Sequence, residues 1–188
     1  MPLPLDGSGA LAPLRRVLRL VEAVEGAPEL AVSVSPRPGY GARLPHLQRA
    51  GRGAWRLGDG REWMLLQSGV PLEQTAQGTL TGRETLQKGD KRQLCLSYSR
   101  GTPGIVPPSG AGPERDLEAT LDWWRGFARQ IDYDGPFRDA LIRSVVTLRL
   151  MTFSMSGAVL AAATTSLPEA IGGGRNWDYR FCWLRDSS

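Results

Sequence analysis

Residues 101–129 read GTPGIVPPSGAGPERDLEATLDWWRGFAR, and this stretch divides the chain into two parts of different character. Eight of its first thirteen residues are Gly or Pro. Such a composition sustains neither a helix nor a central strand, so residues 101–113 are predicted to be a linker. The fold therefore has to be worked out separately on each side of this linker.

The residues that follow the linker have the pattern of an amphipathic helix. Pro113 stands where a first helical residue is favoured, and acidic residues follow it, beginning with Glu114. Arg125 and Arg129 suit the C-terminal half of a helix, where cations interact favourably with the helix dipole. The apolar face of this helix consists of Leu117, Leu121, Trp124, Ala128 and Ile131.

A second helix is predicted to begin near Asp134-Gly135-Pro136 and to run to about Phe153. Its apolar side is wide, so we expect the helix to be well buried. That side consists of Phe137, Leu141, Val145 and Leu148, with Ile142 and Val146 beside them.

Residues 1–110 contain short apolar or alternating runs that are separated by Gly, Pro and polar residues. Alternation at Leu30, Val32 and Val34 precedes a proline, and a short apolar run from Trp63 precedes Gly69. This is the pattern of several short antiparallel strands. We expect Trp55 and Trp63 to pack between sheets as core aromatics, so the whole chain is predicted to be mixed β and α.

Composition and charge predict a globular chain and argue against nucleic acid as its binding partner. The hydrophobic fraction of 41% and the charged fraction of 22% are close to globular averages and predict a packed core. The net charge is +4, but the 21 arginines are scattered and form no basic stripe. Nucleic-acid binding is therefore not expected.

Membrane, metal and cofactor functions are also not expected. The chain has no run of 18 apolar residues, and its N-terminus lacks the apolar core of a signal peptide, so we expect a cytoplasmic location and no membrane contact. Cys95 and Cys182 are far apart in sequence and His46 is the single histidine. The two cysteines are expected to be reduced core thiols, and no metal site or cofactor is predicted.

The chemistry of the chain is concentrated in residues 175–186, where aromatic and charged residues crowd together. Such sets bind sugars: an aromatic ring packs on the apolar face of a pyranose, while Arg and Asp exchange hydrogen bonds with neighbouring hydroxyls. The alternative is that the aromatics are core and that Arg185 and Asp186 form a structural ion pair, and the residues alone do not decide between the two. The set consists of Arg175, Trp177, Asp178, Tyr179, Arg180, Phe181, Trp183, Arg185 and Asp186.

Residues 164–169 (TTSLPE), Gly172-Gly173 and residues 175–186 (RNWDYRFCWLRD) together resemble the beginning of the catalytic domain in bacterial glycoside hydrolase family 15. This family includes glucoamylases and glucoamylase-like trehalases. The resemblance extends upstream through residues 133–136, the second helix and the Trp123-Trp124 pair. Residues 1–110 resemble, more weakly, part of the β-sandwich that precedes the catalytic domain.

The resemblance implies three regions: a partial antiparallel β-sandwich in residues 1–100, the linker 101–113, and in residues 114–188 the first helices of an (α/α)6 barrel. It also implies a substrate, an α-glucoside, and the part of the glucose-binding subsite that Tyr179, Trp183, Arg185 and Asp186 match. Departures from the family pattern at Gly174, Phe181 and Ser187 are mild.

Family 15 hydrolysis inverts the anomeric centre, and it needs an acid and a base roughly 6.5–9.5 Å apart so that a water fits between them. In the family both carboxylates come from later helices, and Glu169, Asp178 and Asp186 match neither position. We therefore predict no catalytic residue in this chain, which would be inactive alone and would lack a C-terminal barrel.

Two other hypotheses remain open. The β-part could be a non-catalytic domain that binds a glucan or another partner, with the helices as an interaction surface. The chain could also be a mis-delimited reading frame with no stable fold, because a two-helix start of a barrel leaves apolar faces uncovered.

Overall fold

A computed structural model describes residues 2–4, 11–13, 15–75, 78–100, 112–153, 156–163 and 169–184. The chain divides into two compact units. The first is Leu14–Ala119, and the second combines Pro2–Pro13 with Thr120–Ser188. Most of the predicted linker, residues 101–111, lies outside the described residues.

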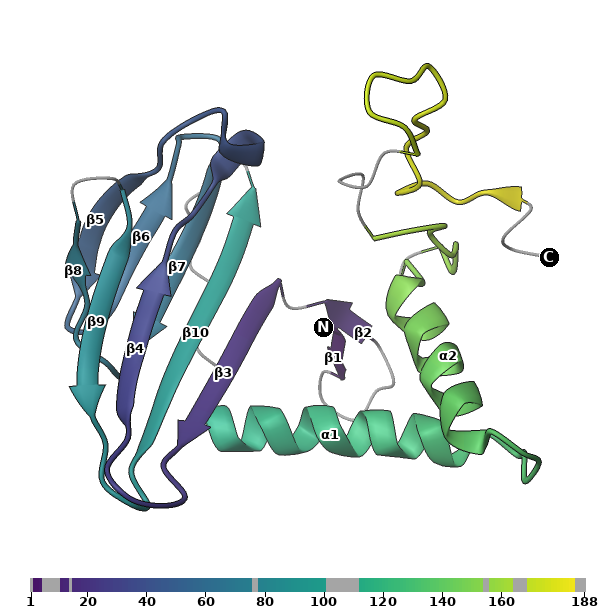
Figure 1. The fold of residues 1–188 in the computed structure, drawn as a ribbon, viewed down its shortest axis with the longest axis horizontal. Helices are drawn as coiled ribbons and strands as arrows, with labels where there is room; N and C mark the ends of the chain where they lie inside the picture. The colour runs from purple at the N-terminus through teal and green to yellow at the C-terminus, as the bar shows by residue number, and fades with distance from the viewer. Residues whose placement is uncertain are drawn as a thin grey trace. The chain divides into compact units, whose positions relative to one another are not determined.

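The first unit contains two antiparallel sheets, as the alternating runs predict (Figure 1). One sheet has five strands in the order β3-β10-β7-β6-β5, and the other has three in the order β4-β9-β8. The strands of the five-stranded sheet are β3 (Arg16–Glu22), β5 (His46–Gly51), β6 (Ala54–Gly58), β7 (Glu62–Ser68) and β10 (Lys91–Arg100). Those of the three-stranded sheet are β4 (Glu29–Val34), β8 (Glu73–Gln74) and β9 (Leu80–Thr85).

The core of this unit lies between the two sheets. Leu57 of β6 and Leu80 of β9 are each 0% exposed, and Trp55 is 5% exposed, so the prediction that Trp55 is a core aromatic is confirmed. The prediction for Trp63 is wrong. Trp63 alternates along β7 with Met64, which packs against the core, so Trp63 lies on the opposite face of the strand. The core cluster consists of Val32, Trp55, Leu57, Leu66, Val70, Leu72 and Leu80.

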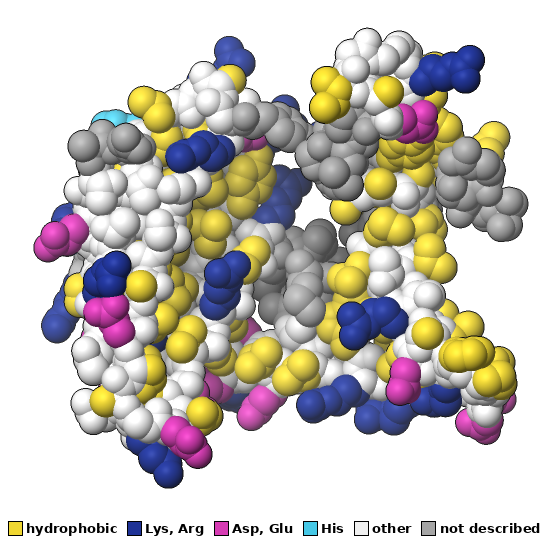
Figure 2. All heavy atoms as spheres, in the orientation of Figure 1, with side chains coloured by type: hydrophobic (Ala, Val, Ile, Leu, Met, Phe, Trp, Pro, Cys, Tyr) yellow, Lys and Arg dark blue, Asp and Glu magenta, His cyan; other side chains and the backbone are white. Residues whose placement is uncertain are grey.

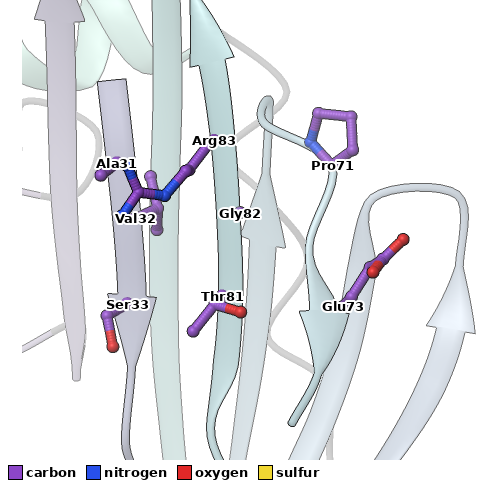
Figure 3. A pocket seen from close by; sticks show the side chains of 8 residues that line it. All are labelled: Ala31, Val32, Ser33, Pro71, Glu73, Thr81, Gly82 and Arg83. Atoms are coloured by element: carbon purple, nitrogen blue, oxygen red, sulfur yellow. The ribbon is translucent and has the colours of Figure 1, made fainter. Parts of the chain in front are cut away.

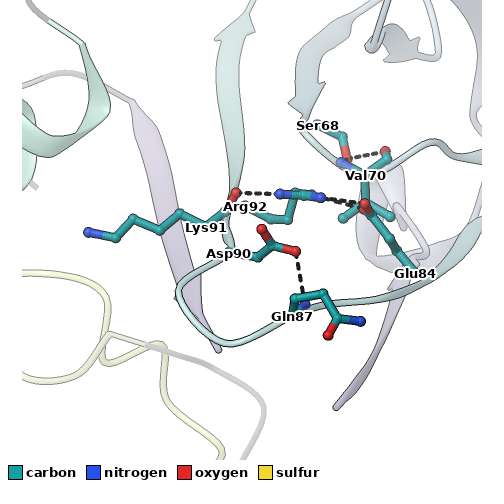
Figure 4. Close-up of polar contacts among 7 residues, drawn as sticks. All are labelled: Ser68, Val70, Glu84, Gln87, Asp90, Lys91 and Arg92. Carbon is teal, nitrogen blue, oxygen red and sulfur yellow. Dashed lines mark hydrogen bonds and ion pairs between the residues drawn. The ribbon is translucent and has the colours of Figure 1, made fainter. Parts of the chain in front are cut away.

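An ion pair links the two sheets where the chain passes from β9 to β10 (Figure 4). Arg92 donates through Nε and Nη2 to the two carboxylate oxygens of Glu84, at 2.9 Å and 2.5 Å. This pair lowers the pKa of Glu84, chiefly through the hydrogen bonds from Arg92. In the intervening turn, the backbone N–H of Gln87 donates to the Asp90 carboxylate at 2.9 Å. The corner is thus held by charged side chains together with Leu86, which follows β9 and is 1% exposed.

Two helices follow the linker, α1 (Pro113–Arg129) and α2 (Arg138–Met151). Pro113 is the first residue of α1, as predicted, and Arg16 of β3 forms an ion pair with Asp116 in its first turn at 3.2 Å. The second helix begins later than predicted, because Phe137 at its N-terminus has a left-handed backbone, with φ of 62°. Residues 133–137 instead form a tight turn, in which the Tyr133 hydroxyl donates to the Pro136 carbonyl at 3.0 Å.

The expectation that the second helix is well buried is wrong. No residue of α2 is buried, and Leu148 and Leu150 are 50% and 54% exposed. Hydrophobic side chains accordingly reach the surface over α2 in Figure 2. Of the predicted apolar side, Ile142, Val145 and Val146 are half-buried within the described part of the chain, whereas Leu141 and Leu148 stay exposed.

The two helices contact each other through an aromatic cluster near the C-terminus of α1. The rings of Trp123 and Phe127 stack at 5.9 Å, and the Arg149 guanidinium of α2 lies 5.8 Å from the centre of the Trp123 ring. Neither described helix is both long and apolar enough to cross a membrane.

The second unit also contains the two-stranded sheet of β1 (Pro2–Pro4) and β2 (Leu11–Pro13).

Candidate functional site

The sequence places the candidate site after α2, in residues 169–184, and the backbone there is fixed by a segment that follows the helix. Leu160 and Cys182 form an antiparallel bridge, and Ala162 donates its N–H to the Tyr179 carbonyl at 2.7 Å. A further bridge joins Val159 to Thr152 at the end of α2. Residues 179–182 are therefore attached, through residues 159–162, to the C-terminus of α2.

Tyr179 and Trp183, both predicted to contact substrate, form a stacked pair. Their ring centres are 5.0 Å apart and their planes are 12° from parallel. The Tyr179 hydroxyl donates to a carboxylate oxygen of Glu169 at 2.7 Å, and both rings are half-buried. Two parallel rings present a flat apolar surface, the kind of surface on which the apolar face of a pyranose packs.

Asp178, the residue before Tyr179, is paired with Arg180. The guanidinium donates to both carboxylate oxygens of Asp178, at 3.0 Å and 2.8 Å, and the backbone N–H of Arg180 donates to one of them at 3.0 Å. These hydrogen bonds from Arg180 lower the pKa of Asp178. The indole N–H of Trp183 lies 3.4 Å from the Asp178 carbonyl oxygen. Asp178 is therefore an ionised structural partner of Arg180.

Asn176 organises the turn that precedes the pair. Its amide nitrogen donates to the carbonyls of Ala170 and Gly173 at 2.9 Å and 3.0 Å, and its amide oxygen accepts from the Ala170 N–H at 3.3 Å. Sequence reasoning assigned no role to Asn176 or Glu169. The signal for Asn176 was the general preference of asparagine for side-chain to backbone bonding in turns. Nothing in the sequence indicated the bond between Glu169 and Tyr179.

Two of the four predicted substrate contacts, Arg185 and Asp186, lie outside the described residues, so their contact with a sugar stays a prediction. The alternative in which the aromatics of this segment are core is wrong for two of them. Trp177 and Phe181 are 56% and 64% exposed. Residues 169–184 thus carry exposed aromatic side chains around one half-buried, stacked pair.

The first unit has hollows of its own, and the one in Figure 3 lies over β4 and β9. Its volume of about 490 Å³ suits a small ligand. Its lining contains no aromatic ring on which a sugar could stack. The lining residues are Ala31, Val32, Ser33, Pro71, Glu73, Thr81, Gly82 and Arg83.

The structure also places the two cysteines and the side chains that could bind a metal ion. Cys95 is buried and Cys182 is exposed, and neither is in a disulfide, so the expectation of a core position is wrong for Cys182. Within the described ranges, no group of three or more His, Cys, Asp or Glu side chains is arranged to hold a metal ion.

Comparison with known proteins identifies relatives of this segment and of the whole chain. Residues 135–188 match the sequence profile of a family described as Glycosyl hydrolases family 15. The chain is 28% identical over 172 residues to a trehalase of Thermoplasma acidophilum, and 34% identical over 185 residues to a trehalase of Mycobacterium tuberculosis, with 92% of the chain covered in each case. It is 44% identical over 110 residues, 56% of the chain, to Trehalase 2 of Sulfolobus acidocaldarius. No solved structure matches significantly.

The resemblance to trehalase-like members of family 15 is thereby confirmed. The alignments extend over nearly all of the chain, so they include most of the β-strand unit as well as the helices. The chain spans 29% of the length of the Thermoplasma acidophilum trehalase, 26% of the Mycobacterium tuberculosis trehalase and 19% of Trehalase 2.

Proposed function

We propose that this chain supplies part of the glucose-binding subsite of an inverting α-glucosidic glycoside hydrolase of the trehalase or glucoamylase type. The observation that carries this proposal is the stacked Tyr179–Trp183 pair, which lies within the stretch that matches family 15. In this proposal residues 114–188 begin an (α/α)6 barrel, and the exposed apolar side of α2 is the side that faces other barrel helices.

Each residue of the subsite has a separate task. Tyr179 and Trp183 form the aromatic surface beside the sugar ring, while Arg185 donates to, and Asp186 accepts from, hydroxyls on neighbouring carbons. The relatives are named trehalases, which favours trehalose as the first sugar to test. Maltose, another α-glucoside, is the second, because the resemblance includes glucoamylases as well as trehalases.

We further infer that the chain binds the sugar without cutting it. Inverting hydrolysis needs an acid and a base on opposite sides of the bond. Glu169 is engaged with the Tyr179 hydroxyl and Asp178 with Arg180, so the described carboxylates of this segment have structural partners. The acid and the base then belong to later helices, as the family resemblance implies.

Calorimetric titration with trehalose and maltose tests the proposal. The wild-type chain is expected to bind at least one of them, and Trp183→Ala is expected to weaken binding about tenfold, because an aromatic anchor at the centre of a site contributes most of its affinity. Trp177→Ala is the matched control, since Trp177 is 56% exposed and outside the stacked pair. Unchanged affinity in Trp183→Ala would remove the pair from the site.

The second candidate, a non-catalytic β-domain that binds a glucan, is supported by the independent core of the first unit. The hollow over β4 and β9 lacks aromatic side chains, which argues against sugar binding there. Titration of Thr81→Tyr, which would crowd that hollow, separates the two candidates. Sugar affinity that falls in Thr81→Tyr but not in Trp183→Ala would favour the β-domain.

A further inference from the structure

The segment from residue 169 to residue 179 is a loop whose two ends are joined by side chains. The Tyr179 hydroxyl donates to Glu169 at 2.7 Å, so the first and last residues of the loop are held together. Three hydrogen bonds that involve the Asn176 side chain, two donated and one accepted, close the turn inside it. The loop is thus fixed by Asn176 and Glu169, and Tyr179 stands at its end.

The turn around Gly172 and Gly173 is tight. A Cβ atom at Gly173 would lie 3.1 Å from the Ala170 Cβ and 3.2 Å from the Ala170 carbonyl oxygen, so the backbone approaches closely here. Gly172 has φ of 75°, in the left-handed region that glycine adopts at little cost. The two glycines let the backbone adopt this turn, and the hydrogen bonds of the Asn176 side chain then restrict its conformational freedom.

We propose that Asn176 and Glu169 are positioning residues for the stacked Tyr179–Trp183 pair, one fixing the turn and the other fixing the phenol, without themselves touching a sugar. The inference rests on the proposed function only in taking this pair as the sugar-binding surface. Its physical basis is preorganisation: a ring held in place before binding loses less conformational entropy when the ligand arrives.

The hydrogen-bonding capacity of Asn176 and Glu169 predicts different effects for different substitutions. Asn176 both donates to and accepts from the backbone, and an aspartate of the same shape cannot make the two donations to the Ala170 and Gly173 carbonyls. Glu169 acts as an acceptor, a role that the amide oxygen of a glutamine also performs. Asn176→Asp should therefore disturb the pair, Glu169→Ala should disturb it too, and Glu169→Gln should largely preserve it.

The first measurement needs no sugar. Nuclear Overhauser contacts between the rings of Tyr179 and Trp183 report the stack directly in the wild-type chain. We expect these contacts to weaken in Asn176→Asp and Glu169→Ala and to persist in Glu169→Gln. Tyr179→Phe, which removes only the hydroxyl, should resemble Glu169→Ala, and adding it to Glu169→Ala should produce no further loss because the same hydrogen bond is already gone.

The second measurement is titration with trehalose. Loss of one of these hydrogen bonds should raise the dissociation constant roughly two- to tenfold. Far-ultraviolet circular dichroism of each variant checks that the fold persists. Should Glu169→Ala unfold, Tyr179→Phe still tests the bond to Glu169, since its ring and packing are unchanged. Should Asn176→Asp unfold, Asn176→Ser, which keeps one hydrogen-bond donor, takes its place.

Unchanged ring contacts in Asn176→Asp, Glu169→Ala and Tyr179→Phe would overturn the positioning roles. A different result, in which the ring contacts respond as expected while the wild-type chain binds neither trehalose nor maltose, would leave the positioning roles intact and overturn the proposed function.

Discussion

Asp178 shows how single residues of the site are held in a defined charge state. Its carboxylate accepts hydrogen bonds from the guanidinium and the backbone N–H of Arg180, and these lower its pKa below the ordinary value of 3.8. A group whose pKa is lower in the folded chain adds stability above its unfolded pKa, and this contribution is lost as the pH falls through the folded pKa. The pairing with Arg180 should therefore persist at neutral pH and weaken only in acid.

Arg180→Gln is expected to raise the pKa of Asp178 toward its ordinary value, because the largest cause of the lowering is the side-chain hydrogen bond from Arg180. Titration of the Asp178 carboxyl carbon by NMR measures the change. Arg175→Gln is the control, since the described contacts of Asp178 involve Arg180 and not Arg175. A pKa that is the same in Arg180→Gln and wild type would contradict the role given to the ion pair.

At the scale of elements, the start of α2 carries a backbone conformation that its residue does not favour. Phe137 is the one non-glycine among the described residues with a positive φ, at 62°, and its side chain is 85% exposed. A left-handed backbone costs a residue with a Cβ roughly 1–2 kcal/mol, and asparagine tolerates it better than phenylalanine. No side chain caps this N-terminus.

Phe137→Asn should therefore raise the free energy of unfolding by roughly 1 kcal/mol. Denaturant unfolding followed by far-ultraviolet circular dichroism measures this change. Phe137→Ala keeps the left-handed cost and loses a ring that is mostly in solvent, so it should stay within about 0.5 kcal/mol of wild type. Equal stability of the asparagine and alanine variants would show that the backbone at this position carries no cost.

The same elements show what the sequence could and could not predict. Alternation identified the strand around Val32, the apolar run identified the strand at Trp63, and the Gly/Pro run with Pro113 identified the start of α1, because these patterns are local. Whether a tryptophan faces the core depends on its place in the alternation of the strand, and Trp55 and Trp63 differ in this respect. The amphipathic pattern of α2 states which side is apolar, but it contains no information about what covers that side.

For the candidate site, the residue types could be predicted from the sequence, but the contacts between their side chains could not. Tyr179 and Trp183 were predicted from a family motif, and the structure adds that their rings stack. The bond between Glu169 and Tyr179 joins residues ten positions apart across a turn, and no periodicity predicts such a pair. Roles of this kind follow only from three-dimensional arrangement.

At the scale of the whole molecule, burial is distributed unevenly along the chain. The ten buried hydrophobic residues of the described part all lie between Ala23 and Cys95, and no residue of either helix is buried. Because burial of apolar surface is the main stabilising term in folding, the free energy that holds the chain together is concentrated in the two sheets. The described contacts of the helices are their own hydrogen bonds, the aromatic cluster around Trp123 and, for α1, the ion pair from Arg16 to Asp116.

Amide hydrogen exchange followed by mass spectrometry should reproduce this distribution. Peptides from β6, β7 and β10 are expected to exchange slowly, because their amides open only when the core around Leu57 opens. Peptides from α2 should exchange much faster, since helices of this length are marginal in water without packing. A fully denatured sample corrects for loss of label and for intrinsic rates. Slow exchange in α2, equal to that of β7, would contradict this expectation and mean that the apolar side of the helix is covered. The cover would be either a surface outside the described residues or a second copy of the chain. Repeating the exchange after dilution distinguishes the two, because only association between copies depends on concentration.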